Sequence, residues 1–490
     1  MAALVPFLKS SDADLRADTA YVFGRFHSSA LQPAIPGLVI ALTGDPAWRV
    51  RANAAYALMT VPKSAGALAV FEKCTSDRDE RVRAACAKGL GIIAKAQHAG
   101  DARVMSSLAA SLGDASRLVR YGAATAFAEL ESTDTFVIHA LAARLDVEPD
   151  PWVRGAIAQA IAMSGAAAEP ALPALTRAVL DPLPLYTANQ VIAAMTAIGA
   201  PAVPTLVATL AYRTPGARYP ARAAIAAKTA LVQLQVPMTA PLITAVQRGP
   251  AQQRMLAAMV LGKKGAGAVE AIPALAAALD DEDASVRRAA TETLGDLAEY
   301  DTGALPALLG ALEDPDANVR EAAVNALDDG LGGTFVSNAR AMAASRAGQP
   351  VPKPVAILPP PLVARMARAL GARLGDSDMA VAGIAAEALG KMGPQAAPAL
   401  AALETALLDP DGDNARDVAD ALAAMGSIGA PLLIEAVRTG ASSADQNNIG
   451  IRGRAAAGLA TLAGNKQLGD YKDAAVAALI DGLSDPRSDV

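Results

Sequence analysis

Aromatic residues, cysteines and histidines are scarce in this sequence of 490 residues, which has 7 Phe, 8 Tyr, 2 Trp, 2 Cys and 3 His. Strands favour aromatic residues, and disulfide scaffolds are rich in cysteine, so we expect neither an all-β fold nor a cysteine scaffold. No apolar run reaches 18 residues without a proline, a glycine or a charge, so no membrane span is expected. Alanine, the strongest helix former, is abundant, and 53% of the residues are hydrophobic. The composition predicts an all-α chain with a substantial core.

The two cysteines, Cys74 and Cys86, lie 12 residues apart, with no Cys-x-x-Cys spacing and no nearby histidine. Zinc sites and thiol-redox sites depend on such spacings. We therefore predict two buried structural thiols in a reducing compartment, which agrees with a cytoplasmic location. No basic segment precedes the first apolar residues, so we expect no signal peptide.

Residues that carry common catalytic chemistries are also missing. The sequence has no P-loop, Gly-x-Ser-x-Gly or His-Glu-x-x-His motif, and none of His27, His98 and His139 is followed by glutamate. A general base or a thiolate nucleophile therefore has few candidates. We expect no enzymatic activity, no catalytic residue and no cofactor.

What the sequence does contain is a motif that recurs every 32 to 37 residues. An acid is followed six positions later by an arginine, as in the pairs Asp45 and Arg51, Asp77 and Arg83, Asp114 and Arg120, Asp281 and Arg287, and Asp314 and Arg320. Aspartate caps helices, so this motif marks the start of a helix. About half a repeat earlier, prolines mark the start of another helix, since proline suits a first helical turn: Pro173, Pro204, Pro241, Pro273, Pro306, Pro398 and Pro431. The period predicts an α-solenoid of about 13 to 14 stacked two-helix repeats.

These repeats resemble the HEAT-repeat family, specifically the short bacterial HEAT-like or phycobilisome-lyase-type repeats. The resemblance covers nearly the whole chain. It implies a curved superhelix whose second helices line the concave face, with the aspartates and arginines forming a ladder between neighbouring repeats. It also implies a structural role for Arg51, Arg83, Arg120, Arg154, Arg287 and Arg320. The family includes scaffolds, chromophore lyases, DNA glycosylases and transport factors, so fold alone leaves the function open.

The repeat spacing is broken once, between Arg320 and Ala382, which lie 62 residues apart. We predict an N-terminal array at 1–329, a Gly/Pro-rich insertion at 330–361 and a C-terminal array at 362–490 that ends inside a repeat. Proline at this density favours polyproline II, and the insertion is either a binding element or a neutral loop. Neither end shows a polar capping repeat, so we expect a segment of a longer chain.

Charge is distributed in blocks along the chain. Residues 182–269 contain no acid and eight basic residues, whereas residues 270–329 contain 15 acids and 3 basic residues. In a stacked array such blocks become patches longer than a Debye length. The basic block is either a solvated face or a partner-binding surface, and its candidate binding residues are Arg213, Arg218, Tyr219, Arg222, Lys228, Arg248, Arg254, Lys263 and Lys264.

A second candidate surface lies five positions after each repeat arginine, where second helices face solvent. This column changes along the array from Tyr21 and Tyr56 through Lys88 to Glu292 and Asn325. Such variation is expected of a groove that touches different parts of a partner, and equally of a surface free to vary. We include Tyr21 and Tyr56 among the candidate partner-binding residues.

One acidic cluster has the ligand spacing of a calcium-binding EF-hand: Asp409, Asp411, Asp413, Asp417 and Asp420. However, Asn414 replaces the usual glycine, and the last position lacks the bidentate glutamate. We favour helix capping over calcium binding and expect no metal site.

Three functions fit the sequence. The leading hypothesis is a non-catalytic scaffold that binds protein partners along its concave face and charged patches. The alternative is a nucleic-acid-binding protein that uses residues 182–269 on phosphates, although the neighbouring acidic block disfavours it. The third is a chromophore-attachment lyase, for which no residue of this sequence can be named.

Overall fold

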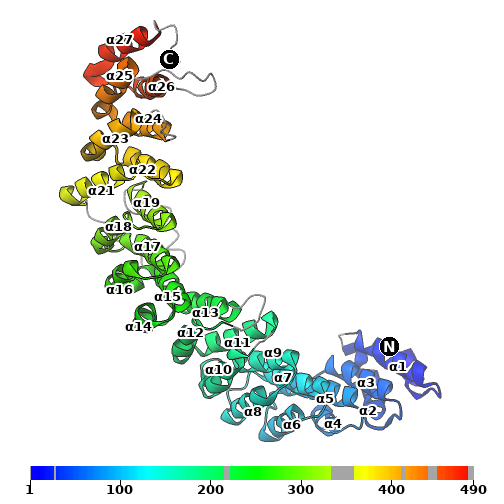
Figure 1. Ribbon diagram of the computed structural model, residues 1–490. Helices are drawn as coiled ribbons and strands as arrows, with labels where there is room; N and C mark the ends of the chain where they lie inside the picture. The colour runs from blue at the N-terminus through cyan, green and yellow to red at the C-terminus, as the bar shows by residue number, and fades with distance from the viewer. Residues whose placement is uncertain are drawn as a thin grey trace. The chain divides into compact units, whose positions relative to one another are not determined.

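The computed structural model describes residues 2–26, 29–181, 184–213, 221–332, 358–409, 414–439 and 450–483. Every regular element in these ranges is a helix, and the chain divides into two compact units, Met1–Pro241 (unit 1) and Leu242–Val490 (unit 2). Within the described residues, thirteen pairs of a first and a second helix follow one another along the chain, and a further first helix, α27, comes after them (Figure 1). The predicted α-solenoid of about 13 to 14 repeats is confirmed.

Unit 1 has two layers. Its second helices pack on one another in chain order, and the first helices cover them on one side (Figure 1). The second helices are α1 (Ala13–Gly24), α3 (Trp48–Met59), α5 (Glu80–Gln97), α7 (Arg117–Leu130), α9 (Pro151–Met163), α11 (Leu185–Ile198) and α13 (Arg222–Gln233). The first-helix layer consists of η1 (Ala2–Lys9), η2 (Ser29–Ala34), α2 (Ile35–Gly44), α4 (Ala67–Cys74), α6 (Ala102–Leu112), α8 (Thr135–Val147), η3 (Gly165–Ala171), α10 (Leu172–Leu180), η4 (Ala200–Ala202) and α12 (Val203–Thr209).

Unit 2 repeats this arrangement. Its second helices are α15 (Ala251–Lys264), α17 (Ala284–Ala298), α19 (Ala317–Gly332), α22 (Met379–Met392), α24 (Ala415–Ala424) and α26 (Ile451–Gly464). Its first-helix elements are η5 (Gly265–Ala271), α16 (Ile272–Ala277), η6 (Ala278–Asp280), η7 (Thr302–Ala304), α18 (Leu305–Ala311), α21 (Pro360–Ala372), η8 (Gly393–Ala399), α23 (Leu400–Leu407), η9 (Gly426–Ile428), α25 (Ala430–Thr439), η10 (Gly469–Tyr471) and α27 (Lys472–Leu483). The preceding first helix, α14 (Thr239–Arg248), begins just before the division.

Small residues explain how second helices approach each other with so few aromatic side chains in the core. Gly91 of α5 faces Ala126 of α7, and a Cβ atom added to Gly91 would lie 2.6 Å from the Cα atom of Ala126. No larger residue fits there without a backbone shift. Alanine and leucine fill most of the remaining core, and the largest fully buried side chains are Phe23, Phe71 and Phe127.

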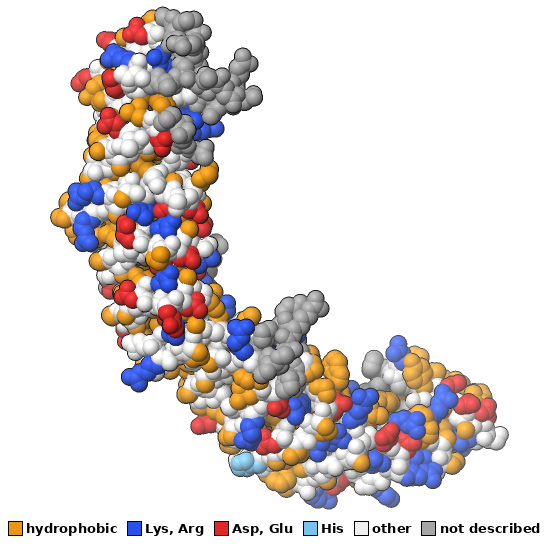
Figure 2. All heavy atoms as spheres, in the orientation of Figure 1, with side chains coloured by type: hydrophobic (Ala, Val, Ile, Leu, Met, Phe, Trp, Pro, Cys, Tyr) orange, Lys and Arg blue, Asp and Glu red, His pale blue; other side chains and the backbone are white. Residues whose placement is uncertain are grey.

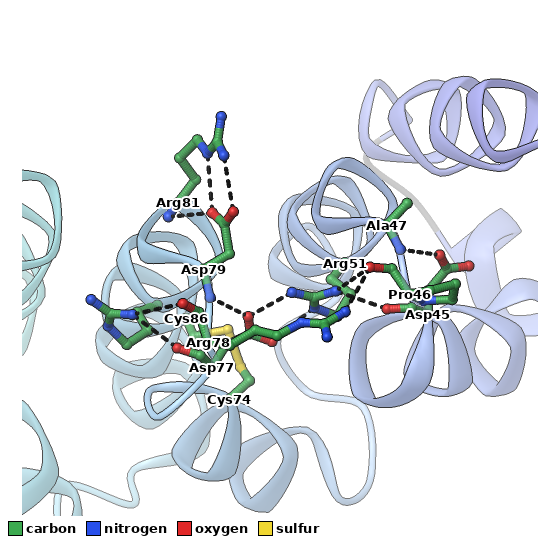
Figure 3. A network of polar contacts seen from close by, with 11 residues as sticks. Asp45, Pro46, Ala47, Arg51, Cys74, Asp77, Arg78, Asp79, Arg81 and Cys86 are labelled. Atoms are coloured by element: carbon green, nitrogen blue, oxygen red, sulfur yellow. Dashed lines mark hydrogen bonds and ion pairs between the residues drawn. A yellow bond between two sulfur atoms is a disulfide. The ribbon is translucent and has the colours of Figure 1, made fainter.

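A ladder of arginines links successive repeats. Arg51 donates from Nη1 to the carbonyl oxygen of Asp45 in its own turn at 2.8 Å, and from Nε and Nη2 to the carboxylate of Asp77 in the next repeat, each at 2.8 Å (Figure 3). The same carboxylate accepts the backbone N–H of Asp79, so it holds the turn as well as the arginine. The series comprises Arg16 and Asp45, Arg51 and Asp77, Arg83 and Asp114, Arg120 and Glu148, Arg154 and Asp181, Arg254 and Asp281, Arg287 and Asp314, and Arg320 and Asp376.

The ladder continues past the insertion. Arg320 of α19 binds Asp376, 56 residues further along the chain, at 2.8 Å and 2.7 Å, and α19 packs on α22. The repeats before and after the insertion therefore stack directly on each other within unit 2. The middle of the predicted insertion, residues 333–357, and the predicted ending inside a repeat, residues 484–490, lie outside the described residues.

The prediction of two separate thiols is wrong, because Cys74 and Cys86 form a disulfide (Figure 3). Cys74 ends α4, and Cys86 lies in the second turn of α5, so the helical hairpin brings their Cα atoms to 5.7 Å, within the usual range for a disulfide. In a helical hairpin, two cysteines 12 residues apart can lie next to each other. The spacings of zinc and thiol-redox motifs carry no information about this kind of contact. Disulfides persist in oxidising environments, so the bond does not support the expected reducing compartment. None of the described helices is long and apolar enough to cross a bilayer.

The ladder predicts a strong local effect of Arg120→Met. Glu148 is fully buried and would lose its bidentate partner, keeping only Arg144 and the backbone N–H of Asp150, so we expect a loss of about 3 kcal/mol in local stability. Hydrogen exchange of α7 and α9 measures it, because repeat arrays open locally. The matched control is Arg177→Met, which breaks the exposed pair with Asp146 and should cost about 0–1 kcal/mol. Equal effects of the two variants would contradict a structural ladder.

Stability should also depend on pH in a defined direction. The hydrogen bond from Arg83 lowers the pKa of Asp114 below its ordinary value, so the unfolded chain binds this proton more readily than the folded chain. The stabilisation is present above the ordinary carboxylate pKa of about 4 and is lost as the pH falls through the lower folded value. Urea unfolding between pH 7 and pH 2.5 should show this decrease. It should be smaller in an Arg83→Met/Asp114→Asn variant, and an unchanged profile there would argue against this pair.

The disulfide should stabilise the third repeat. It closes a short loop around the α4–α5 turn, so reduction should lower the stability of these helices by about 2–3 kcal/mol. Thermal melts with and without a phosphine reductant, together with the 2 Da mass difference of the linked peptide, measure this effect. A Cys74→Ala/Cys86→Ala variant should not respond to the reductant. A native protein whose thiols both react with iodoacetamide without reduction would refute the bond.

Candidate partner-binding surface

The ladder fixes which side of each second helix faces solvent. Arg16 and Arg51 point into the stack, and Tyr21 and Tyr56, five residues further on, are 56% and 51% exposed. The solvent-facing position predicted for these two tyrosines is confirmed, while their role in binding stays a prediction. On the face shown in Figure 2, basic and acidic side chains alternate along unit 1 and do not form a patch of one sign.

Further exposed aromatic residues lie on the second helices of unit 1, and the sequence analysis did not single them out. Tyr121, Trp152 and Tyr186 are all exposed, and the rings of Trp152 and Tyr186 lie 5.3 Å apart between neighbouring repeats. In a similar position on α3 and α5, the guanidinium of Arg81 lies 3.4 Å from the ring centre of Trp48. Trp152 and Tyr186 are the second residues of α9 and α11, and Tyr121 directly follows the repeat arginine of α7, so none of them lies in the column five positions after that arginine. A search of one repeat column therefore misses them, whereas a search of whole first turns would have found them.

The predicted basic residues in unit 1 are placed as follows. Arg213 follows α12 and is exposed, Arg222 is the first residue of α13 and is exposed, and Lys228 lies half-buried on the same helix. Arg218 and Tyr219 lie outside the described residues. Only Arg222 and Lys228 therefore stand on a described second helix of this unit.

In unit 2, several residues of the basic block already have partners. Arg254 belongs to the ladder and binds Asp281 at 2.7 Å, so its guanidinium is engaged within the fold. Lys263 pairs with Asp296 at 3.2 Å, and burial lowers the pKa of the half-buried Lys264. Arg248 is exposed at the end of α14. The block is thus divided between two units, and part of its charge is balanced within the fold.

Four acidic residues of unit 2, Glu292, Asp296, Glu299 and Glu321, line a cavity of about 320 Å³ on α15, α17 and α19. Two ion pairs stand in its lining, Lys263 with Asp296 and Arg288 with Glu292, the second at 2.9 Å. Much of the charge at this cavity is therefore used between neighbouring helices.

The structure describes only part of the acidic cluster, 409–420, for which the sequence favours helix capping over calcium binding. Asp411 and Asp413 lie outside the described residues, and Asp417 and Asp420 belong to α24. Burial and the nearby Asp420 raise the pKa of Asp417. Over the described ranges, no group of three or more histidine, cysteine or acidic side chains could hold a metal ion.

A family model described as "HEAT repeats" matches residues 1–91, 35–128, 72–162 and 239–328, together just over half of the chain. This chain belongs to the HEAT-repeat family. The matched regions contain all eight ladder arginines, and the unmatched residues 163–238 include Ala188, which occupies the arginine position in α11. The preceding residue, Thr187, donates from its hydroxyl to the carbonyl oxygen of Pro151 in the previous repeat at 2.8 Å.

Among solved structures, the HEAT-repeat chain is similar to Kap121p. The TM-score is 0.53 for the structure titled "Crystal structure of Kap121p" and 0.55 for those with bound Pho4p and bound Nup53p, at 15%, 14% and 13% identity. The matches cover 98%, 98% and 99% of this chain and 55% of each Kap121p chain, so the chain spans about half the length of Kap121p. At such low identity the likeness shows the fold alone. No curated protein matches the sequence.

Proposed function

We propose that this HEAT-repeat chain is a non-catalytic scaffold that binds protein partners along its second helices and charged patches. The observation that carries the proposal is the set of exposed aromatic residues on the second helices of unit 1: Tyr21, Tyr56, Tyr121, Trp152 and Tyr186. Tyrosine and tryptophan provide large contact areas at low entropic cost and dominate the energetics of many interfaces. The buried ladder holds the helices that carry them, so the surface is preorganised for binding.

The comparison supports the proposal only at the level of fold. Kap121p shares the helical stacking, and the titles of its structures name bound proteins, Pho4p and Nup53p among them. Nucleic-acid binding is the weaker candidate, because phosphate contacts need several available cations. Arg254 and Lys263, two of the eight basic residues in the block, are bound to carboxylates of the same chain.

A photo-crosslinking amino acid placed on each layer tests the proposal in the native host. A crosslinker that replaces Tyr56 or Tyr121, on second helices, should give discrete protein adducts that survive nuclease treatment. In a packed interface the crosslinker contacts one partner, so it reacts with that protein. Ile40 on α2 and Phe136 on α8, which are exposed in the first-helix layer, are the matched control positions. Mass spectrometry of the adducts identifies the partner.

Two outcomes would contradict the scaffold. Adducts that disappear after nuclease treatment would show that nucleic acid is the ligand and would favour the alternative. Adducts that form equally from Ile40 and Phe136 would show that the aromatic side chains mark no preferred surface.

A further inference from the structure

A groove runs between α11 and α13 at the C-terminal part of unit 1. It has a volume of about 400 Å³, and its lining contains the apolar side chains of Ile192 and Ile225. The 53% exposure of Ile225 is high for an isoleucine on a helix that otherwise buries its apolar face. Asn189 and Gln233 line the same groove and carry amide groups that can donate to and accept from a peptide main chain. The hydroxyl of Thr229, which donates to the carbonyl oxygen of Ile225, can accept a hydrogen bond there.

The helices around this groove carry no carboxylate. None of the helices α9, α11 and α13 contains an aspartate or glutamate, while Arg222 and Lys228 supply positive charge on α13. The nearest acids in sequence are occupied: Asp150 caps α9 and contacts Arg117, and Asp181 binds Arg154. A negatively charged ligand therefore meets little repulsion at this surface.

An aromatic platform stands beside the groove. Trp152 of α9 and Tyr186 of α11 contact each other between repeats, and both rings are exposed. Asn189 of the groove lies one helical turn beyond Tyr186, so the platform and the groove adjoin along α11. Arg222, at the start of α13, lines the groove as well.

We propose that this surface binds an extended acidic peptide segment of a protein partner, with an apolar side chain seated in the groove. The apolar side chain contacts Ile192 and Ile225, and a second apolar or aromatic side chain packs on Trp152 and Tyr186. Carboxylates of the peptide lie near Arg222. The proposal rests on the scaffold function and adds the chemical class of the partner and its place of binding.

The geometry favours a peptide over nucleic acid. A nucleic-acid strand needs a row of cations for its phosphates, and these three helices offer two besides the ladder residue Arg154. The groove offers an apolar floor with amide side chains, which suits one buried side chain and a peptide main chain.

The test is selection of phage-displayed random 12-residue peptides on the full chain. We expect the selected peptides to be enriched in aspartate and glutamate and to contain at least one large apolar residue. Binding of the strongest peptide, synthesised with a fluorescein label, should weaken about tenfold or more in Ile225→Glu and in Trp152→Ser. Arg222→Glu should select peptides with lysine or arginine in place of the acids.

The matched control is Ile40→Glu, which makes the same change at an exposed isoleucine of the first-helix layer and should leave peptide binding unchanged. Circular dichroism melts check that each variant is folded, and Arg222→Glu, at an exposed helix start, provides the test if Ile225→Glu is unstable. Selected peptides without an excess of acids, or equal binding by Ile225→Glu and Ile40→Glu, would overturn the proposal. Crosslinks from Tyr56 together with either result would leave the scaffold function standing and refute only this site.

Discussion

The bond between a repeat arginine and the acid of the next repeat is the interaction on which the rest of this structure depends. Each arginine satisfies the carbonyl oxygens of its own turn and the carboxylate that opens the next turn, so one side chain sets both the turn and the position of the neighbouring repeat. Buried ion pairs contribute less net stability than their short distances suggest, but they make wrong registers costly. The ladder is therefore best understood as a register device, while alanine and leucine packing provides most of the stabilisation.

The arginine ladder also determines which residues of the second helices are exposed. Because the arginine points into the stack, the residues around it have fixed outward positions, and the chain varies them freely: Tyr56 in the second repeat, Lys88 in the third and Glu292 in the ninth. The exposed aromatic residues gather in unit 1, and paired acids and bases line the cavity of unit 2. The two units thus present different chemistry on equivalent helices, which is what a scaffold with more than one contact region requires.

The fold could be predicted from the sequence because its determinants are local and repeated. Asp77 and Arg83 mark a turn and a helix wherever the pattern recurs, and Pro173 and Pro204 mark helix starts for a reason that needs no tertiary information. The disulfide could not be predicted in this way, since it depends on how α4 lies against α5. The same holds for Trp152 and Tyr186, whose contact joins two repeats. For Arg254, the sequence shows the positive charge but not the ion pair with Asp281 that balances it.

The ladder is interrupted between Asp181 and Arg254, where Ala188 occupies the arginine position in α11 and no acid occurs from residue 182 to residue 269. The division between the two compact units, at Pro241 and Leu242, falls within this interval. In a chain whose repeats contact only their neighbours, cooperativity is transmitted from interface to interface, and an interface without its ion pair transmits less of it. We therefore expect the two units to unfold separately, with the interruption as the boundary between them.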